Sequence, residues 1–572
     1  MFVGCVALAT SCDLTENVQV KADKSMIFGS KSGLELYSNS FYKALPTLKN
    51  GFMQDKMCDV GAVSNTDTFI KQGAYNTETA TSWSWGALKN INYFIDGCND
   101  PKYCTVDDNT RDNYLGIARW FRAWFYYDKL TTYGEVPWFP HDIQSYQNDV
   151  MYKDRDSRDV IIRNLIADLD FAYEHIQATS STGSSTLTRW AAAALKSRVC
   201  LFEAAYRRYH NLTELEITPE ELYREAAKAA KLVIDNSGCS LNTATGKKGA
   251  YRDLFYNETP LTQEVILAVC ANEKSGIFGE QNWWFNARSY GLCWSLVRSF
   301  VHTYLKLDGT PFTDAADYAV KSFTEEMEGR DLRLEQTVRG RNFLWDGKTA
   351  VADIKNLSLT GYQVIKYTLD ESKYDGGAKN INSIPLIRYA EVLLNYAEAQ
   401  AELGVITDSE WALTVGALRK RAGITGGTET LPTTVDGYLQ RTFYPDVTSP
   451  VLLEIRRERA IELVAEGMRF DDLRRWKCGS LMETLRWSGI HIPGLEQPVD
   501  VNGDGVNDYY FTEGEVVSAP AAYKNIAVRV NQDGVGLYAE ANPVSGYDLV
   551  YKTGAGDRYW SCRPDRNPTG AS

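Results

Sequence analysis

The chain has 572 residues, of which 24% are charged and 44% hydrophobic, so it is long enough for several cores and its composition excludes a disordered protein. Its formal net charge of −13 excludes a nucleic-acid partner, because such binding depends on basic groups that neutralise phosphates. The 34 tyrosines, 21 phenylalanines and 14 tryptophans, many of them in polar, glycine-bearing segments, indicate a binding surface.

Residues 1–12 read MFVGCVALATSC, an apolar stretch that ends in small residues and a cysteine. This is the shape of an export signal, although the usual basic start is missing. Its ending resembles a bacterial lipoprotein signal, in which Cys12 would be acylated and become the mature N-terminus. The alternative is a buried strand with an ordinary cysteine. No later stretch approaches 18 consecutive apolar residues, so the sequence predicts no membrane-spanning helix after residue 12.

Apolar residues at three- and four-residue spacing predict a first helical block over about residues 110–237. Its helices are expected at residues 114–130, 159–175, 188–209 and 220–235. Short connections and alanine-rich faces favour stacked antiparallel helix pairs of the tetratricopeptide type. Just before this block, Cys98 and Cys104 are compatible with a loop disulfide or with two free thiols.

Residues 240–385 change character, because glycines, asparagines and aromatics mix with short strand-like runs such as 264–268. A second helical block follows over about residues 385–478, with helices expected at 387–403, 411–422 and 451–467. Residues 485–572 again lack a helical period. The prediction is a mainly α protein, a helical repeat scaffold with long irregular loops and short β-hairpins as insertions, where binding residues usually lie.

Three aromatic clusters lie in this polar sequence and are predicted to bind the ligand. Their members are Trp83 and Trp85; Trp283, Trp284, Tyr290 and Trp294; and Trp345. A flat ring beside polar side chains suits a sugar, whose C–H face stacks on the ring while its hydroxyls take the polar groups. Taken singly, each ring is more often a core residue, but as a group in loop-like sequence they favour binding. If the segment holding Trp283 and Trp284 is extended, one ring faces the sugar and the other anchors the loop.

No catalytic residue is predicted. The five histidines are scattered without metal-ligand or triad spacing. Glu458, Glu462 and Glu466 recur every four residues on one helix face, which is compatible with acid–base work. Arginines surround them, however, and a carboxylate among guanidiniums stays ionised, so a structural ion-pair network is the favoured interpretation.

Residues 500–508 read DVNGDGVND, which matches the spacing of a calcium loop. The expected ligands are the side chains of Asp500, Asn502, Asp504 and Asp508 and the backbone carbonyl of Val506. The bidentate glutamate of such loops is missing, since Phe511 stands in its place, and Glu513 is the candidate substitute. The prediction is a structural calcium ion, and the alternative is a glycine-rich hairpin turn.

Several of these segments together resemble the SusD/RagB family of outer-membrane glycan-binding lipoproteins, over essentially the whole chain. The most specific are IPLIRYAEVLLNYAEAQAELG and LLEIRRERAIELVAEGMRFDDLRRW, supported by ARWFRAWFYYDKLTTYGEVPWF and LVRSFVHTYLKLDGTPF. The resemblance implies one domain over residues 13–572, a tetratricopeptide-like scaffold and no catalytic activity. It also implies a SusC-like TonB-dependent transporter as partner, over whose barrel the lipoprotein sits as a lid. The C-terminal GDRYWSCRPDRNPTGAS departs from the usual family ending.

The favoured function is therefore a lipid-anchored protein on the surface of a Gram-negative outer membrane that binds oligosaccharides and delivers them to its transporter. One alternative is the uptake of peptides or glycoproteins by the same lid mechanism. A second is a glycoside hydrolase, which needs two carboxylates across a cleft. A third is a helical scaffold for protein partners. Whether the aromatic rings converge in one exposed cleft distinguishes it from the favoured function.

Overall fold

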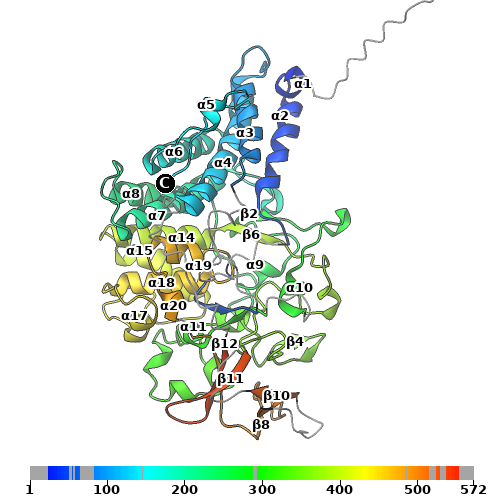
Figure 1. The fold of residues 1–572 in the computed structure, drawn as a ribbon, viewed down its shortest axis with the longest axis vertical. Coiled ribbons are helices and arrows are strands. Elements are labelled where there is room, and N and C mark those ends of the chain that lie inside the picture. Colours follow the sequence, from blue (N-terminus) through cyan, green and yellow to red (C-terminus); the bar gives the residue numbers. More distant parts are fainter. Residues whose placement is uncertain are drawn as a thin grey trace, which may run out of the picture.

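The computed structural model describes residues 24–49, 55, 58–64, 83–144, 146–287, 293–484, 486–514, 524–528 and 536–552. Cys12 and Tyr290 lie outside the described residues. Helices occupy one end and one side of the elongated molecule, and most of the strands lie at the opposite end (Figure 1).

The first helical block is a stack in which successive long helices pack on one another. It contains α1 (Lys24–Phe28), α2 (Lys31–Ser38), α3 (Gly86–Cys98), α4 (Asp108–Tyr133), α5 (Asn148–Met151), α6 (Arg158–His175), α7 (Arg189–Tyr209) and α8 (Pro219–Asn236). Contacts run from α3 to α4, then to α6, α7 and α8. The predicted antiparallel stack is confirmed, and α3 extends it beyond the predicted start. Cys98 and Cys104 are free thiols in this structure.

Capping residues and alanines explain this block. Asp107, Ser157, Thr188 and Thr218 each accept a backbone N–H at the start of α4, α6, α7 and α8, which satisfies an otherwise unpaired donor. The run of four alanines in α7, residues 191–194, is buried and lets neighbouring helices approach closely. Helix α7 is therefore the buried centre of the stack.

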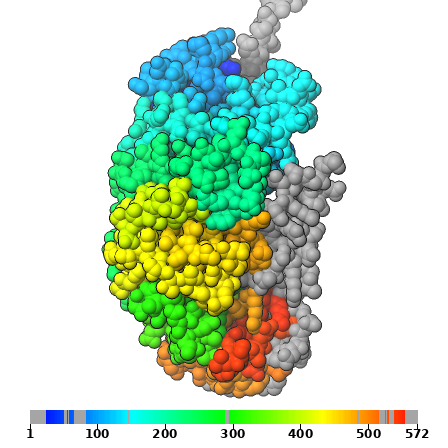
Figure 2. Space-filling view, turned by 90° about the vertical axis from the view of Figure 1, so that its left-hand side faces the viewer, coloured from blue at the N-terminus to red at the C-terminus, as the bar shows by residue number. Residues whose placement is uncertain are grey.

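The second helical block continues the same stack, because α14 packs on both α8 and α18. It contains α14 (Tyr389–Glu402), α15 (Asp408–Leu413), α16 (Val415–Arg421), α17 (Gly437–Phe443), α18 (Pro450–Glu462), α19 (Arg469–Arg475) and α20 (Leu481–Thr484). Figure 2 shows the second block, in yellow, against the first block, in blue to green. The two predicted blocks thus form one continuous scaffold.

Two predicted helices of this block differ in the structure. The single helix expected over residues 411–422 is broken at Thr414, whose hydroxyl donates to the carbonyl of Glu410 at 2.6 Å and whose backbone leaves the helical region. The helix expected over residues 451–467 ends at Glu462. Glu466 therefore lies beyond the helix that carries Glu458 and Glu462.

The insertions contain short helices and strands rather than long loops alone. The helices are α9 (Asp253–Tyr256), α10 (Gln281–Asn286), α11 (Arg298–Val301), α12 (Phe323–Met327) and α13 (Arg333–Thr337). Three antiparallel strand pairs join β1 (Gly61–Ala62) to β3 (Ser295–Leu296), β2 (Val265–Val269) to β6 (Ile384–Arg388), and β4 (Leu344–Trp345) to β5 (Lys348–Thr349). The strand predicted at residues 264–268 corresponds to β2.

The C-terminal segment forms two three-stranded sheets, which the sequence analysis did not predict. One sheet has the order β10 (Lys524–Val528), β9 (Tyr509–Glu513), β8 (Pro498–Val499). The other has the order β11 (Gly536–Ala541), β12 (Tyr547–Lys552), β7 (Ser488–Ile492). Strands β9 and β10 are parallel, so no hairpin turn that the sequence could reveal joins them.

A buried ion-pair network joins the insertions to the helical scaffold, and it confirms the structural interpretation of the glutamates. Glu462 accepts from Arg333 of α13 at 2.8 Å, from Arg388 of β6 at 3.0 Å, and from Arg421 of α16. All four side chains are at most 2% exposed. Burial alone would raise the pKa of Glu462, but the three guanidiniums outweigh it and hold that pKa below its ordinary range.

We expect Glu462→Gln to lower the free energy of unfolding by about 3 to 5 kcal/mol, because it leaves three buried guanidiniums without their shared charge. The exposed pair of Glu429 with Lys420 provides the matched control, and Glu429→Gln should cost at most about 1 kcal/mol. Urea unfolding of both variants measures the difference. Equal stability of the two variants would contradict this role.

The same network predicts a pH dependence. Because the folded-state pKa of Glu462 is depressed, its contribution is present above the ordinary pKa of 4.5 and is lost as the pH falls through the folded value. Wild-type protein should therefore lose stability on acidification more steeply than Glu462→Gln.

Candidate functional site

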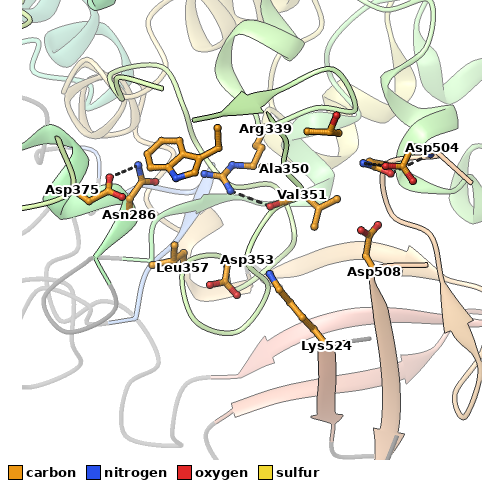
Figure 3. Close-up of a pocket in the computed structure, with 13 residues that line it drawn as sticks. Asn286, Arg339, Ala350, Val351, Asp353, Leu357, Asp375, Asp504, Asp508 and Lys524 are labelled. Atoms are coloured by element: carbon orange, nitrogen blue, oxygen red, sulfur yellow. Dashed lines mark hydrogen bonds between the residues drawn. The ribbon is translucent and has the colours of Figure 1, made fainter. Parts of the chain in front are cut away.

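A pocket of about 400 Å³ lies between the β4–β5 hairpin, the segment that follows it and the β8–β10 sheet (Figure 3). We call it the first pocket. Its lining residues come from five separate parts of the chain: Asn286, Arg339, Trp345, Thr349, Ala350, Val351, Asp353, Leu357, Asp375, Asn502, Asp504, Asp508 and Lys524. The volume is within the range of small-molecule sites.

The β4–β5 hairpin brings Trp345 to the pocket. Leu344 pairs with Thr349 and Trp345 with Lys348, so the two turn residues are Asp346 and Gly347. Both have positive φ, 50° and 73°, which is the two-residue turn that Asp-Gly favours because glycine bears no Cβ. The half-buried Trp345 ring stacks on Phe343 with centroids 6.3 Å apart, so the turn chemistry and this contact together hold the ring in place.

Arg339 lies at the centre of the pocket and carries an unpaired charge. Its guanidinium donates through Nη1 to the carbonyl of Val351 at 3.0 Å, while Nε has no hydrogen-bond partner. The residue is 7% exposed, and no carboxylate pairs with it among the described residues. Burial lowers the pKa of Arg339 to about 10. A buried guanidinium with an N–H that has no hydrogen-bond partner is costly, so Arg339 is well suited to donate to a ligand oxygen.

One wall of the pocket is held by a chain of amide hydrogen bonds. Gln363 donates to the Asn286 carbonyl oxygen at 3.1 Å, and its own carbonyl oxygen accepts the backbone N–H of Asp353. Asn286 in turn donates to Asp375 at 3.3 Å. Burial raises the pKa of Asp375 to about 6, although the amides of Asn282 and Asn286 oppose the shift. Figure 3 shows Asn286 and Asp375 at one end of the pocket, with Arg339 between them and Asp504.

The opposite rim is the predicted calcium loop. Asp500 accepts the backbone N–H groups of Gly503 and Gly505 at 2.6 and 2.8 Å, and Asp508 accepts that of Val501 at 2.9 Å. Burial raises the pKa of Asp508, and the like charges of Asp500 and Asp504 add to the effect. These carboxylates are therefore close enough to interact.

The fit of this loop to calcium is incomplete in the present arrangement. Asn502 and Asp504 bond to each other rather than to a common centre, with the Asn502 amide donating to Asp504 at 3.0 Å. Within the described residues, no group of three or more His, Cys, Asp or Glu side chains is placed to hold a metal ion. The loop thus has the composition of a calcium loop without its coordination sphere, and calcium stays a prediction.

The predicted aromatic residues that the structure describes do not all lie in the first pocket. Trp345 alone of the described rings lines the first pocket. Trp294 is 3% exposed and packs edge-on against Phe285, so it is a core residue with no surface to offer a ligand. Trp85 packs on Phe125, Tyr126 and Phe139 of the first helical block. Trp83 lies beside it, against Tyr133, and is 44% exposed.

Trp283 and Trp284 lie on helix α10, not on an extended segment, so the expectation of opposite faces is wrong. Successive helical side chains are separated by about 100° and not by the 180° of a strand. Trp284 packs against the core. Trp283 lies beside Gly377, and a Cβ atom added to that glycine would be 3.5 Å from the Trp283 ring. Neither ring lines the first pocket, but Asn286 from the same helix does.

Sequence reasoning missed Arg339, Asp353 and Asp375. Arg339 precedes Trp345 by only a few residues, and this proximity could have indicated that the two side chains share a site. The two aspartates carried none, because a single Asp in polar sequence is usually solvated.

The matched family model carries the description SusD family and covers residues 263–533, which include every residue that lines the first pocket. A curated relative, the SusD-like protein P38 of Formosa agariphila, is 25% identical over 378 residues. That match spans 63% of this chain and 66% of the relative, slightly less than two thirds of its length. The chain is therefore similar to the SusD family.

Solved structures agree with the fold. A SusD-like carbohydrate-binding protein from Bacteroides fragilis superposes with a TM-score of 0.64 at 20% identity, covering 84% of this chain and 94% of that one. Another SusD-like protein from the same organism gives 0.61 at 22% identity, covering 82% and 90%. A structure described as a complex with xylogluco-oligosaccharide gives 0.52 at 18% identity, covering 78% and 84%. The protein thus has the mainly α fold predicted from its sequence, which is the fold of these SusD-like structures.

Proposed function

We propose that this protein, which is similar to the SusD family, binds oligosaccharides in the first pocket. The observation that carries the proposal is the presence of a half-buried tryptophan, Trp345, in one pocket with a buried guanidinium, Arg339, that forms no direct ion pair with a described carboxylate. The ring can take the C–H face of a sugar, while Arg339, Asn286 and Asp375 offer donors and acceptors to its hydroxyls. The carbohydrate-binding description of one structural neighbour supports the same class of ligand.

Binding without catalysis is the better account of the pocket. A glycoside hydrolase needs one carboxyl group that protonates the leaving oxygen and a second one across the bond. The pKa of Asp375, raised to about 6, would suit an acid, but its Oδ1 accepts from both Asn282 and Asn286. These two donors hold the group as a fixed acceptor, which favours a ligand-orienting role.

We expect Trp345→Ala to weaken oligosaccharide binding roughly tenfold or more, because a central aromatic contact dominates such sites. The probes are malto-, cello-, xylo- and xylogluco-oligosaccharides of graded length, measured by titration calorimetry alongside thermal melts. Trp83→Ala, which removes an exposed ring outside the pocket, is the matched control and should bind as wild type. Trp294→Ala should instead destabilise the fold by about 3 to 5 kcal/mol.

Other outcomes select other functions. A binding defect confined to Trp83→Ala or Trp283→Ala would move the site away from the first pocket. Release of reducing ends by the purified protein would select the hydrolase. Binding of peptides with no response to any oligosaccharide would select the peptide-uptake alternative.

We also propose a calcium ion at Asp500, Asn502, Asp504, Asp508 and the Val506 carbonyl, as an ordering ion at the pocket rim with no catalytic part. Its binding would require Asp504 to exchange its loop partners for the ion. Calcium at a hundredfold excess over its dissociation constant should then stabilise the protein by roughly 2.7 kcal/mol. Thermal melts with calcium or chelator test this, with Asp504→Ala as the variant that should lose the effect. Equal melting temperatures of the wild-type protein in calcium and in chelator would refute calcium binding at this loop.

Finally, we propose that the protein is a cell-surface lipoprotein that delivers its ligand to a SusC-like TonB-dependent transporter, with Cys12 as the acylated residue. The match to the SusD family model supports this placement. None of the described helices is long and apolar enough to cross a bilayer. We expect Cys12→Ala to appear in the soluble fraction of cells that lack the transporter, because one covalent lipid signal is removed. Retention of the variant in washed membranes would count against the anchor.

A further inference from the structure

A second pocket, of about 680 Å³, lies on the other side of the β4–β5 hairpin. It is larger than the first pocket, whose volume is about 400 Å³. Its wall comes from the α9 region, from α13 and from residues 340–344, so the two pockets share the chain segment that leads into β4.

The hairpin presents an apolar side chain to each pocket. Leu344 and Trp345 are consecutive residues of β4, so their side chains point to opposite faces of the strand. Trp345 lines the first pocket and Leu344 the second, where it is 50% exposed. A large aliphatic side chain this exposed at a pocket wall offers contact surface to a ligand.

Phe343 forms the partition between the two pockets. It is 7% exposed, and a guanidinium lies near its ring from each pocket: Arg339 at 4.7 Å from the first and Arg252 at 5.7 Å from the second. In the second pocket, Arg252 is paired with Asp370 and lies 5.3 Å from the half-buried ring of Tyr256. Each pocket is thus lined by an arginine, by at least one aromatic ring and by one large side chain of β4, which in the first pocket is the ring of Trp345 itself.

Three further side chains of the second pocket are available to a ligand. Glu335 of α13, Lys248 and Asn342 all line it, and none has a hydrogen-bond or ion-pair partner among the described residues. Glu335 is the most informative, because it is half-buried and burial raises its pKa. Lys248 and Arg341 attract this carboxylate, but they form no direct ion pair with it. A half-buried carboxylate that accepts no hydrogen bond is costly, and a ligand hydroxyl would satisfy it.

We propose that the second pocket is a second oligosaccharide-binding site, with Tyr256 and Leu344 as its apolar contacts and Glu335, Lys248 and Asn342 as its hydroxyl partners. Because donors and acceptors of both charges line it, the fitting ligand is a neutral polyhydroxylated one. The choice of a sugar rests on the proposed function, since the two pockets share their chemistry. The protein then binds two short oligosaccharides, one on each face of the hairpin.

Titration calorimetry with di- and trisaccharides of the malto-, cello-, xylo- and xylogluco- series tests this. Wild-type protein should bind two molecules of the accepted sugar. Tyr256→Ala and Glu335→Ala should each weaken one of the two sites roughly tenfold or more and leave the other unchanged. Trp345→Ala should instead remove binding in the first pocket. Tyr146→Ala, which removes an 80% exposed ring outside both pockets, is the control and should retain two sites.

Each outcome is informative. A single site that Trp345→Ala abolishes and that Tyr256→Ala and Glu335→Ala leave intact would overturn the second site and keep the proposed function. A second site insensitive to both variants would place it elsewhere and overturn the assignment. No binding of any sugar would overturn both proposals. If Tyr256→Ala does not fold, Glu335→Ala and Asn342→Ala carry the test, because neither is in the core.

Discussion

The structure depends on the buried charge of Glu462, to which three guanidiniums from separate segments converge. Arg333, Arg388 and Arg421 come from α13, β6 and α16, and Glu264 accepts from the last two. Charges this deeply buried must be paired, because removing one partner leaves an uncompensated ion. The network therefore fixes how the insertion between the two helical blocks lies on the scaffold, more specifically than apolar packing would.

The position of the first pocket follows from that constraint. Arg333 anchors α13 through its ion pair with Glu462. Directly after this helix, Val338 forms an antiparallel β-bridge with Val364, and the next residue, Arg339, lines the pocket. Lys366, held by Glu466 at 2.7 Å, anchors the neighbouring segment two residues further on. Buried ion pairs thus fix both segments of the pocket wall. A preorganised binding site requires this rigidity.

The hairpin that carries Trp345 links the site to its proposed function. The conformation of its Asp-Gly turn follows from local chemistry. Its two faces can contact ligands only because a pocket lies on each side of the hairpin. An arginine paired with no described carboxylate on one face and an unpaired glutamate on the other give each cavity a polar group that a sugar hydroxyl can satisfy. Two binding faces on one rigid element would let the protein hold more sugar than either pocket alone.

The sequence by itself determined the helical scaffold and the structural nature of the glutamates, because helix periodicity and surrounding arginines are local signals. It also singled out Trp345 and the loop at Asp500–Asp508 as binding features, and both reach the first pocket. Tertiary structure alone decided that Trp294 is core, that Trp283 and Trp284 lie on a helix, and that Arg339, Asp353 and Asp375 share a pocket. Those outcomes depend on contacts between segments far apart in sequence, such as the hydrogen bond from Gln363 to Asn286, which no local pattern specifies.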